Sequence, residues 1–217
     1  MLIHPNSKLL FNGDSITDAD RKQPGPSEGL FDPMGRGYVT MVDSLLGAVY
    51  PQLHTRVVNV GISGSTVRDL AGSWQTNVVD LKPDWLSIMI GTNEVWRQFD
   101  SPTQKERHVH PEEYESTYAS LLERTRMSLK GLVLMTPFYI EPNTRDAMRA
   151  RMDEYGQIVK RLAEKFEAVF VDTQATFDQV LPHYYPAKLS WDRVHPSQTG
   201  HMILAKAFLD GVGFQWG

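Results

Sequence analysis

Five short apolar runs rich in β-branched residues recur along this chain, and longer segments with helical periodicity separate them. The apolar runs are residues 8–11, 56–60, 85–90, 132–135 and 169–171. The helical segments are residues 38–49, 67–79, 111–129, 145–166 and 198–209. Alternation of this kind predicts βαβ units, and so a mainly parallel sheet that helices cover on both faces.

The alternation continues without a break in composition and without an internal repeat, which favours a single domain over residues 1–217. A chain of 217 residues is long enough to bury one substantial core. The sequence therefore predicts an α/β fold of three layers, with five parallel strands between two layers of helices.

Composition and charge limit the kinds of partner and chemistry that the chain can have. The net charge is −4 at pH 7, and the basic residues are scattered, so there is no basic patch for nucleic acid. No apolar stretch approaches the roughly 20 residues that span a bilayer. The start lacks the pattern of a signal peptide, although a chain whose signal had been removed would look similar. The absence of cysteine excludes disulfides, thiolate metal sites and a cysteine nucleophile, and we expect a cytoplasmic protein with no nucleic-acid and no membrane partner.

A serine follows the first apolar run at once, in the segment Asn12-Gly13-Asp14-Ser15. Glycine permits a tight turn, and Asp and Ser favour turns and helix N-caps. A serine at such a strand-to-helix junction has an exposed hydroxyl and a backbone N–H at the positive end of the coming helix. Many serines at such junctions only cap a helix, so catalysis by Ser15 depends on partners elsewhere in the chain.

One of the seven histidines offers a base for that serine. Asp192-x-x-His195 places a carboxylate three residues before an imidazole, just ahead of the last helical segment. Across a turn, this spacing allows the carboxylate to bond one ring nitrogen while the other nitrogen points outward. Such pairing fixes the tautomer and stabilises the imidazolium that forms during proton transfer. An isolated Asp-x-x-His is more often an ordinary helix-entry turn, so the motif gains its meaning from Ser15.

Two further strand ends offer donors for a developing oxyanion. A glycine-rich segment that ends at Gly64 follows the run 56–60, and Asn93 follows the run 85–90. Each segment alone also fits an ordinary turn glycine or an asparagine cap. Because ligands bind at the carboxyl edge of an open α/β sheet, we expect Ser15, Gly64 and Asn93 to converge there.

Three irregular stretches begin at or soon after predicted strand ends, at residues 24–37, 97–110 and 136–144. Loops at this edge suggest a walled pocket, with disorder or a subunit contact as the alternatives for each stretch. His108 and His110, in the second stretch, have a spacing that suits a metal. No carboxylate nearby completes such a site, so we expect solvent-exposed side chains and no metal.

The four blocks 13–15, 61–64, 91–93 and 192–195 occur in the order found in the SGNH/GDSL hydrolases, and the chain resembles this family over nearly its whole length. The resemblance implies a flavodoxin-like, three-layer α/β/α sandwich. It implies Ser15 as nucleophile, His195 as general base and Asp192 as the residue that orients His195.

The same resemblance implies an oxyanion hole built from the Ser15 N–H, the Gly64 N–H and the Asn93 side-chain amide. Glu94 stands where many members of the family have Asp. This difference leaves the role of Asn93 intact, but it leaves open which supporting contact, if any, position 94 makes.

The segments between the blocks resemble one branch, the intracellular acetylxylan esterases of bacilli; they are residues 67–70, 95–98, 135–141 and 213–216. That resemblance implies a homo-oligomeric serine esterase without a cofactor. Its substrates would be acetylated xylan, xylo-oligosaccharides or xylose acetates. Aromatic side chains present large apolar faces on which sugar rings stack, and they serve equally in cores and subunit contacts. The candidate substrate-binding aromatic residues are Trp96, Tyr139, Tyr185, Trp191 and Trp216.

Two other functions stay open on the sequence. A lysophospholipase or general short-chain carboxylesterase of the same fold would use the same blocks, and the lipid enzyme would prefer longer acyl chains. A flavodoxin-like binding protein would cradle a phosphate with residues 13–17. That protein would not need Asp192 or His195, and no cation accompanies the turn before Arg21.

Overall fold

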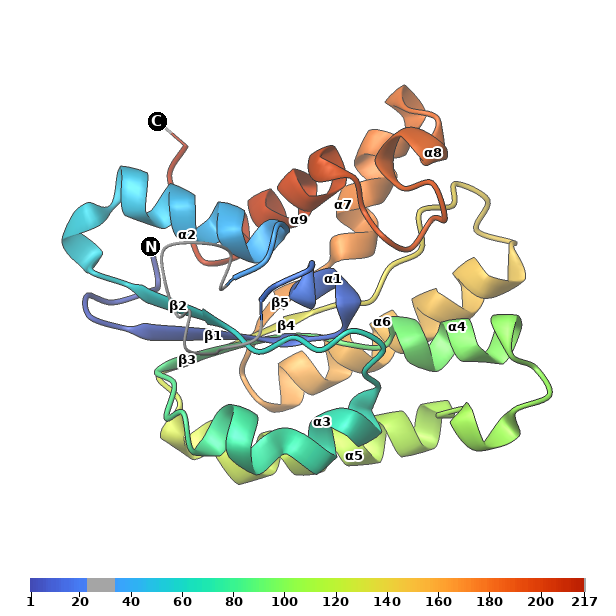
Figure 1. Ribbon diagram of the computed structural model, residues 1–217, viewed down its shortest axis with the longest axis horizontal. Helices are drawn as coiled ribbons and strands as arrows, with labels where there is room; N and C mark the ends of the chain where they lie inside the picture. The colour runs from blue at the N-terminus through green and yellow to red at the C-terminus, as the bar shows by residue number, and fades with distance from the viewer. Residues whose placement is uncertain (23–33, 217) are drawn as a thin grey trace.

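The five strands form one sheet in the order β2-β1-β3-β4-β5, and every neighbouring pair is parallel (Figure 1). The computed structural model describes residues 1–22 and 34–216. The strands are β1 (Lys8–Gly13), β2 (Arg56–Asn59), β3 (Trp85–Met89), β4 (Gly131–Met135) and β5 (Val169–Val171). The predicted α/β fold with a five-stranded parallel sheet is confirmed.

The strand order creates a topological switch point at β1. The chain moves from β1 outward to β2, and then returns to β3 on the other side of β1. In sheets of this flavodoxin-like order, the connections diverge at that point and leave a crevice at the carboxyl ends of the strands. The segments that follow β1, β2 and β3 therefore meet at one edge of the sheet.

Alternate residues of the central strands pack on opposite faces of the sheet, as the two-residue period of a strand requires. On β1, Leu10 belongs to the core on one face, and Leu9 and Phe11 belong to the core on the other. All three side chains are completely buried. Burial on both faces explains why these strands read as continuous apolar runs in the sequence.

Helices cover both faces of the sheet (Figure 1). One layer contains α2 (Tyr38–Val49), α7 (Thr173–Val180) and α9 (Gln198–Gly211), and the other contains α3 (Val67–Trp74), α4 (Thr92–Asp100), α5 (Pro111–Thr125) and α6 (Ala147–Lys165). Two helices of four residues, α1 (Ser15–Asp18) and α8 (Pro186–Leu189), lie at the carboxyl edge of the sheet and beyond it. The short 3-10 and π segments are η1 (Pro51–Leu53), η2 (Gln75–Val79), η3 (Lys105–Arg107), η4 (Arg126–Ser128) and η5 (Leu181–His183).

The structure corrects part of the predicted irregular stretch 97–110. Helix α4 continues through Asp100, and η3 occupies Lys105–Arg107. The buried residues of α4 include Thr92, Asn93 and Glu94. Because three of its four buried residues are polar and only Val95 is apolar, the buried side of α4 does not read as the continuous apolar stripe by which the other long helices are recognised. Residues 24–33 of the first predicted irregular stretch lie outside the described residues.

Among the described residues, no helix has both the length and the apolar character needed to cross a membrane.

Candidate active site

Ser15 is the first residue of α1, two residues beyond the end of β1. The side chain of Asp14 caps this helix by accepting a hydrogen bond from the Ile16 N–H at 3.0 Å. Gly13 permits the close turn, because a Cβ at this position would lie 2.4 Å from the Met89 carbonyl oxygen. The tight junction leaves the Ser15 side chain part-exposed at the carboxyl edge of the sheet.

Ser15, His195 and Asp192 form a continuous chain of hydrogen bonds. Ser15 Oγ lies 2.9 Å from His195 Nε2, and His195 Nδ1 lies 2.7 Å from Asp192 Oδ2. The His195 side chain is 41% exposed, so it is accessible from solvent. This geometry can move a proton from the serine hydroxyl to the imidazole while the carboxylate holds the ring in place.

The turn before α9 holds the Asp192 carboxylate from several sides. Oδ1 accepts hydrogen bonds from the Val194 and His195 backbone N–H groups at 2.9 and 2.8 Å, and from the Ser190 hydroxyl at 2.9 Å. Burial alone would raise the pKa of Asp192, but the hydrogen bonds from His195, Val194 and Ser190 together outweigh it and lower the pKa. Asp192 is therefore ionised at neutral pH, as a carboxylate that stabilises an imidazolium must be.

Gly64 and Asn93 lie beyond the ends of β2 and β3, as the strand order requires. Gly64 has a φ of +83°, a left-handed conformation that glycine adopts without strain. The Asn93 amide nitrogen donates to the Ser65 carbonyl at 3.0 Å, which joins the two loops. Because an amide group has two N–H donors, the second N–H of Asn93 is still available for a ligand.

Two buried carboxyl groups lie behind these loops. Burial raises the pKa of Asp14 to about 6, against the opposing effects of the Ile16 N–H and His195. Burial also raises the pKa of Glu94 to about 8. The sequence alone gave no partner for Glu94; in the structure its Oε1 accepts a hydrogen bond from the Val67 N–H at 2.6 Å. A carboxyl residue directly after Asn93, at a helix start, was the only sequence signal for this contact.

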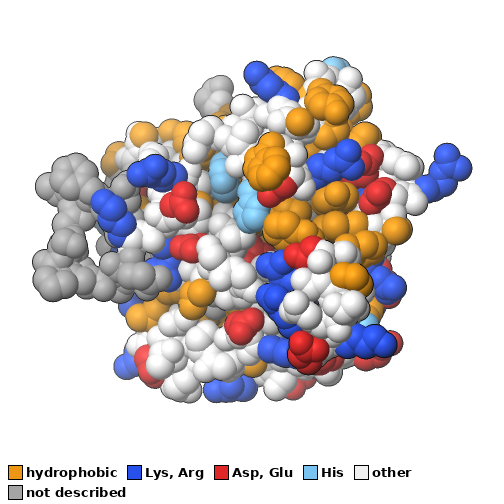
Figure 2. Space-filling view, turned by 45° about the vertical axis from the view of Figure 1, so that its right-hand side comes forward, with side chains coloured by type: hydrophobic (Ala, Val, Ile, Leu, Met, Phe, Trp, Pro, Cys, Tyr) orange, Lys and Arg blue, Asp and Glu red, His pale blue; other side chains and the backbone are white. Residues whose placement is uncertain are grey.

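We call Ser15, His195 and Asp192 the triad. Three of the five candidate aromatic residues lie in segments that carry the triad or contact the turn that holds it. The Trp96 ring contacts the His195 ring with their centroids 5.5 Å apart, and the Arg97 guanidinium lies 5.0 Å from the Trp96 centroid. Trp191, next to Asp192, is 82% exposed. Tyr139 is half-buried, and its N–H donates to Gln174 Oε1 at 2.8 Å. Figure 2 shows histidine side chains next to a group of hydrophobic side chains on the face that it displays.

The other two candidate aromatic residues, Tyr185 and Trp216, lie outside the turn that carries Asp192 and His195. Tyr185 precedes α8 and is 78% exposed. Trp216 Nε1 donates to Asp210 Oδ1 at 2.6 Å, at the C-terminal end of α9. His195 precedes the N-terminal end of this 14-residue helix, whose length is about 21 Å. The structure therefore does not bring Trp216 together with Ser15.

The His108–His110 pair corrects one expectation. His110 is exposed, but His108 is buried, and its Nε2 lies 3.0 Å from the Ser101 carbonyl oxygen. This hydrogen bond closes the loop between α4 and α5. Within residues 1–22 and 34–216, no group of three or more His, Asp or Glu side chains is arranged to hold a metal ion.

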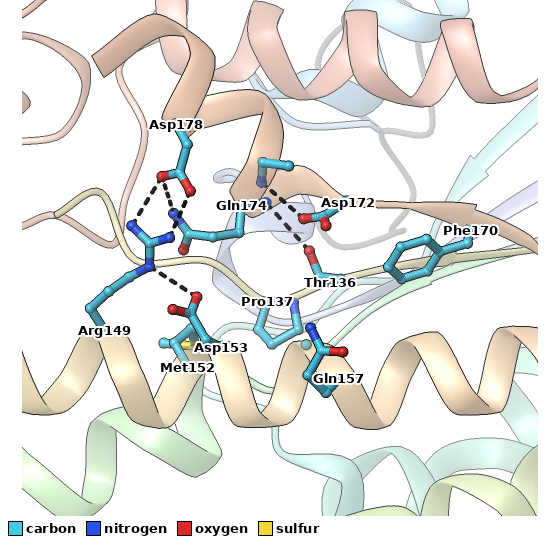
Figure 3. Close-up of a pocket in the computed structure, with 12 residues that line it drawn as sticks. Thr136, Pro137, Arg149, Met152, Asp153, Gln157, Phe170, Asp172, Gln174 and Asp178 are labelled. Atoms are coloured by element: carbon cyan, nitrogen blue, oxygen red, sulfur yellow. Dashed lines mark hydrogen bonds and ion pairs between the residues drawn. The ribbon is translucent and has the colours of Figure 1, made fainter. Parts of the chain in front are cut away.

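A separate cavity of about 230 Å³ lies between α6 and α7 (Figure 3). Arg149 lines it and forms a bidentate ion pair with Asp178, with hydrogen bonds of 3.0 and 2.6 Å. Asp153 accepts from the other side of the same guanidinium at 2.9 Å. The lining includes neither the Ser15–His195–Asp192 chain nor the Gly64 and Asn93 loops, so the cavity is distinct from the candidate active site.

The parallel α/β fold and the Ser15–His195–Asp192 site are shared with a class of hydrolases. The sequence model of the GDSL-like lipase/acylhydrolase family matches residues 11–203. The chain belongs to this family.

The similar proteins are more specific than the family. An acetylxylan esterase of Geobacillus stearothermophilus is 58% identical over 216 residues, which is 100% of this chain and 98% of the relative. The crystal structure of Axe2, an acetylxylan esterase of the same organism, superposes with a TM-score of 0.96 at 58% identity and the same coverage. LAE5, an enzyme from the metagenome of Lake Arreo, has a TM-score of 0.96 at 52% identity, covering 98% of each chain.

Other solved structures are described as catalytic mutants of Axe2. In these, a serine, an aspartate or a histidine is replaced by alanine. The types of residue altered are the three types that this chain brings together in Ser15, Asp192 and His195.

Proposed function

We propose that this protein is a serine esterase that removes acetyl groups from acetylated xylo-oligosaccharides and related xylose acetates. The observation that carries the proposal is the chain of hydrogen bonds from Ser15 through His195 to Asp192. The full-length similarity to acetylxylan esterases supports the substrate class.

The reaction proceeds through an acetyl-serine intermediate. His195 Nε2 accepts the proton of Ser15 Oγ as this oxygen attacks the acetyl carbonyl carbon. The imidazolium, held by Asp192, then gives the proton to the departing sugar oxygen, and the sugar hydroxyl leaves. Water attacks the acetyl-serine with His195 again as base, and acetate leaves as Ser15 regains its proton.

The carbonyl oxygen becomes an oxyanion in both tetrahedral intermediates. We assign its stabilisation to the backbone N–H groups of Ser15 and Gly64 and to the free N–H of the Asn93 amide. Ser15 N is at the N-terminal end of α1, where backbone donors and the helix dipole favour negative charge. Donors that are fixed before the charge develops stabilise the transition state without a cost of reorganisation.

A panel of substrates tests the proposal. Hydrolysis would be measured as acetate released from acetylated xylo-oligosaccharides and acetylated pectin fragments, as fatty acid released from lysophospholipids, and as nitrophenol released from acetyl and octanoyl nitrophenyl esters. We expect acetylated xylo-oligosaccharides and the acetyl ester to be preferred. A large preference for the octanoyl ester or for lysophospholipid would identify the second candidate, a lipid esterase of the same family.

The Ser15→Ala variant is the control in this panel. It removes the attacking oxygen without disturbing the Asp14 cap, so the fold and the thermal midpoint should be retained. The kcat should fall by roughly 10⁴-fold or more. Substantial remaining esterase activity would contradict the role of Ser15.

We further propose that the protein is a cytoplasmic homo-oligomer. Trp191 and Tyr185 are exposed large aromatic side chains, and aromatic side chains at a surface are typical of contacts between proteins. Light scattering coupled to size exclusion would give the mass of the assembly, and cell fractionation would give the location. A monomer at micromolar concentration would contradict the first part, and recovery outside the cytoplasm the second.

A further inference from the structure

Glu94 forms a hydrogen bond between two helices and has no part in the proposed reaction steps. It follows Asn93 in the first turn of α4 and is completely buried. Its Oε1 accepts a hydrogen bond from the Val67 N–H at 2.6 Å, and Val67 is the first residue of α3. A carboxyl group from one helix thus satisfies a free backbone N–H at the start of another.

Two further donors at the start of α3, the backbone N–H groups of Thr66 and Asp69, are satisfied locally. Thr66 and Asp69 form a capping box, in which Asp69 Oδ2 accepts from the Thr66 backbone N–H at 2.8 Å. This box is exposed and involves residues of α3 and its cap only. Glu94 is therefore the part of the cap that fixes α3 to a different segment of the chain.

A second hydrogen bond joins the start of α4 to the segment before α3, next to the bond between Glu94 and Val67. The Asn93 amide donates to the Ser65 carbonyl oxygen, and Glu94 accepts from the Val67 N–H. Two consecutive residues of α4 thus hold two positions of the segment that follows Gly64. These two hydrogen bonds join the segment that carries Gly64 to the start of the helix that carries Asn93.

We propose that Glu94 is a positioning residue for the oxyanion hole, which ties the start of α3 to α4 and so keeps the Gly64 and Asn93 donors at the spacing that the oxyanion requires. This role rests on the proposed function. Glu94 does not touch the reacting atoms; it acts through Val67 and through its neighbour Asn93.

The surroundings of Glu94 favour its neutral form in this role. Oε2 has no hydrogen-bond partner among the described residues, and burial raises the pKa to about 8. As a protonated acid, Glu94 still accepts from Val67 through its carbonyl oxygen. When ionised, it would add a negative charge behind an oxyanion that is itself negative. The titratable and charged groups that interact electrostatically with Glu94 are Asp14, Asp69, Arg68, Tyr114, Tyr118 and Tyr155.

Three substitutions distinguish the effect of the Glu94–Val67 hydrogen bond from the effect of side-chain packing at position 94. Glu94→Gln keeps an acceptor for the Val67 N–H in a neutral group, so its kcat at pH 7 should stay within about threefold of the wild type. Glu94→Met fills the same space without an acceptor, and Glu94→Asp is one methylene too short to reach. Both should lose roughly tenfold or more in kcat with a smaller change in KM, because the oxyanion forms only in the transition state.

The matched control is Thr66→Ala, which weakens the capping box of the same helix but leaves the Val67–Glu94 bond. It should lower the thermal midpoint without a comparable loss of kcat. The pH profile gives a further readout. In the wild type, kcat should fall as Glu94 ionises above about pH 8, and in Glu94→Gln this decline should be absent.

The rate at which a fluorophosphonate labels Ser15 measures the same oxyanion hole without any acetyl ester. Parallel losses of labelling and kcat in Glu94→Met and Glu94→Asp, with retention in Glu94→Gln, would support the proposal. Wild-type rates in either of the first two variants, or an equal loss in Glu94→Gln, would overturn it; if Glu94→Met does not fold, Glu94→Asp decides. A wild type that is labelled at Ser15 but hydrolyses no acetyl ester would refute the proposed function and leave the labelling series to judge Glu94.

Discussion

Arg193 donates a hydrogen bond to Oε2 of Glu141, across 52 residues of the sequence. Arg193 lies between Asp192 and His195 and has a left-handed backbone, with a φ of +67°. Its carbonyl oxygen accepts from the Ile140 N–H at 2.9 Å. Both contacts fix the turn that carries two members of the triad to the segment that follows β4.

Arg193→Gly tests whether this attachment matters for turnover more than for stability. The substitution removes the left-handed strain of about 1 kcal/mol and an ion pair worth about 1 kcal/mol or less. The free energy of unfolding should therefore change little. The kcat should fall roughly three- to tenfold, because a freer turn holds His195 less well against Ser15.

Chemical denaturation and steady-state kinetics measure the two quantities. Arg151→Ala is the control, since it breaks an exposed ion pair with Glu154 on α6. It should leave kcat unchanged. An Arg193→Gly variant with wild-type kcat would show that the Ile140 backbone bond alone holds the turn.

Asn93→Ala removes one of the proposed oxyanion donors and also the bond to the Ser65 carbonyl. We expect kcat to fall by roughly 10²–10³, with KM changing much less. Asn93→Asp keeps the shape but replaces the donor by a carboxylate, so it should be at least as impaired. An unchanged kcat in Asn93→Ala, from acetate release at saturating substrate, would exclude the amide from the oxyanion hole.

His201 predicts how stability depends on pH. Burial lowers its pKa to about 4, against 6.5 when unfolded, and the neutral ring accepts a hydrogen bond from the Tyr38 N–H at 3.3 Å. Between pH 6.5 and pH 4 the unfolded chain binds a proton at His201 and the folded chain does not. Acidification therefore lowers the free energy of unfolding through this group, by up to about 3 kcal/mol.

Asp14 acts in the opposite direction over nearly the same range. Its pKa of about 6 in the folded protein exceeds the ordinary 3.8, so the folded chain binds the extra proton and gains stability on acidification. His201→Gln should remove the His201 contribution but keep that of Asp14 and of the other shifted groups, and so reduce or reverse the acid loss that His201 causes. Urea denaturation at pH 7, 6 and 5 measures it, and the exposed His183→Gln is the control. A pH dependence like that of the wild type in His201→Gln would contradict the assignment.

The sequence predicts the parts of this molecule that depend on local pattern. The strands are apolar because both faces of the sheet are buried, so their positions follow from hydrophobicity alone. The Asp192–His195 pair lies within one turn, so its spacing is visible in the chain. Ser15, Gly64 and Asn93 converge because each follows a strand, and parallel strands end at the same edge.

Contacts between distant segments have no such signal. The partner of Glu94 is 27 residues away and is a backbone N–H, which every residue other than proline has. Arg193 and Glu141 are ordinary charged residues in the sequence, and only the packing of the segment after β4 against the turn makes them a pair. Helix α4 was missed for a related reason, since three of its four buried residues, Thr92, Asn93 and Glu94, are polar.

Trp96→Ala tests what limits the size of the acyl group. The Trp96 ring lies against His195, and the same helix carries Asn93, so the indole borders the space in which we expect the acyl group to lie. Removing it should raise the ratio of kcat/KM for octanoyl over acetyl nitrophenyl ester by roughly tenfold or more, since even one methylene more or less in an apolar pocket is worth about 1–3 kcal/mol. Phe99→Ala changes an exposed aromatic residue of the same helix and should leave the ratio unaltered. The ratio is compared in both variants at equal Ser15 labelling. If Trp96→Ala keeps the wild-type ratio, another side chain must close the acyl site, and the short-chain preference does not come from α4.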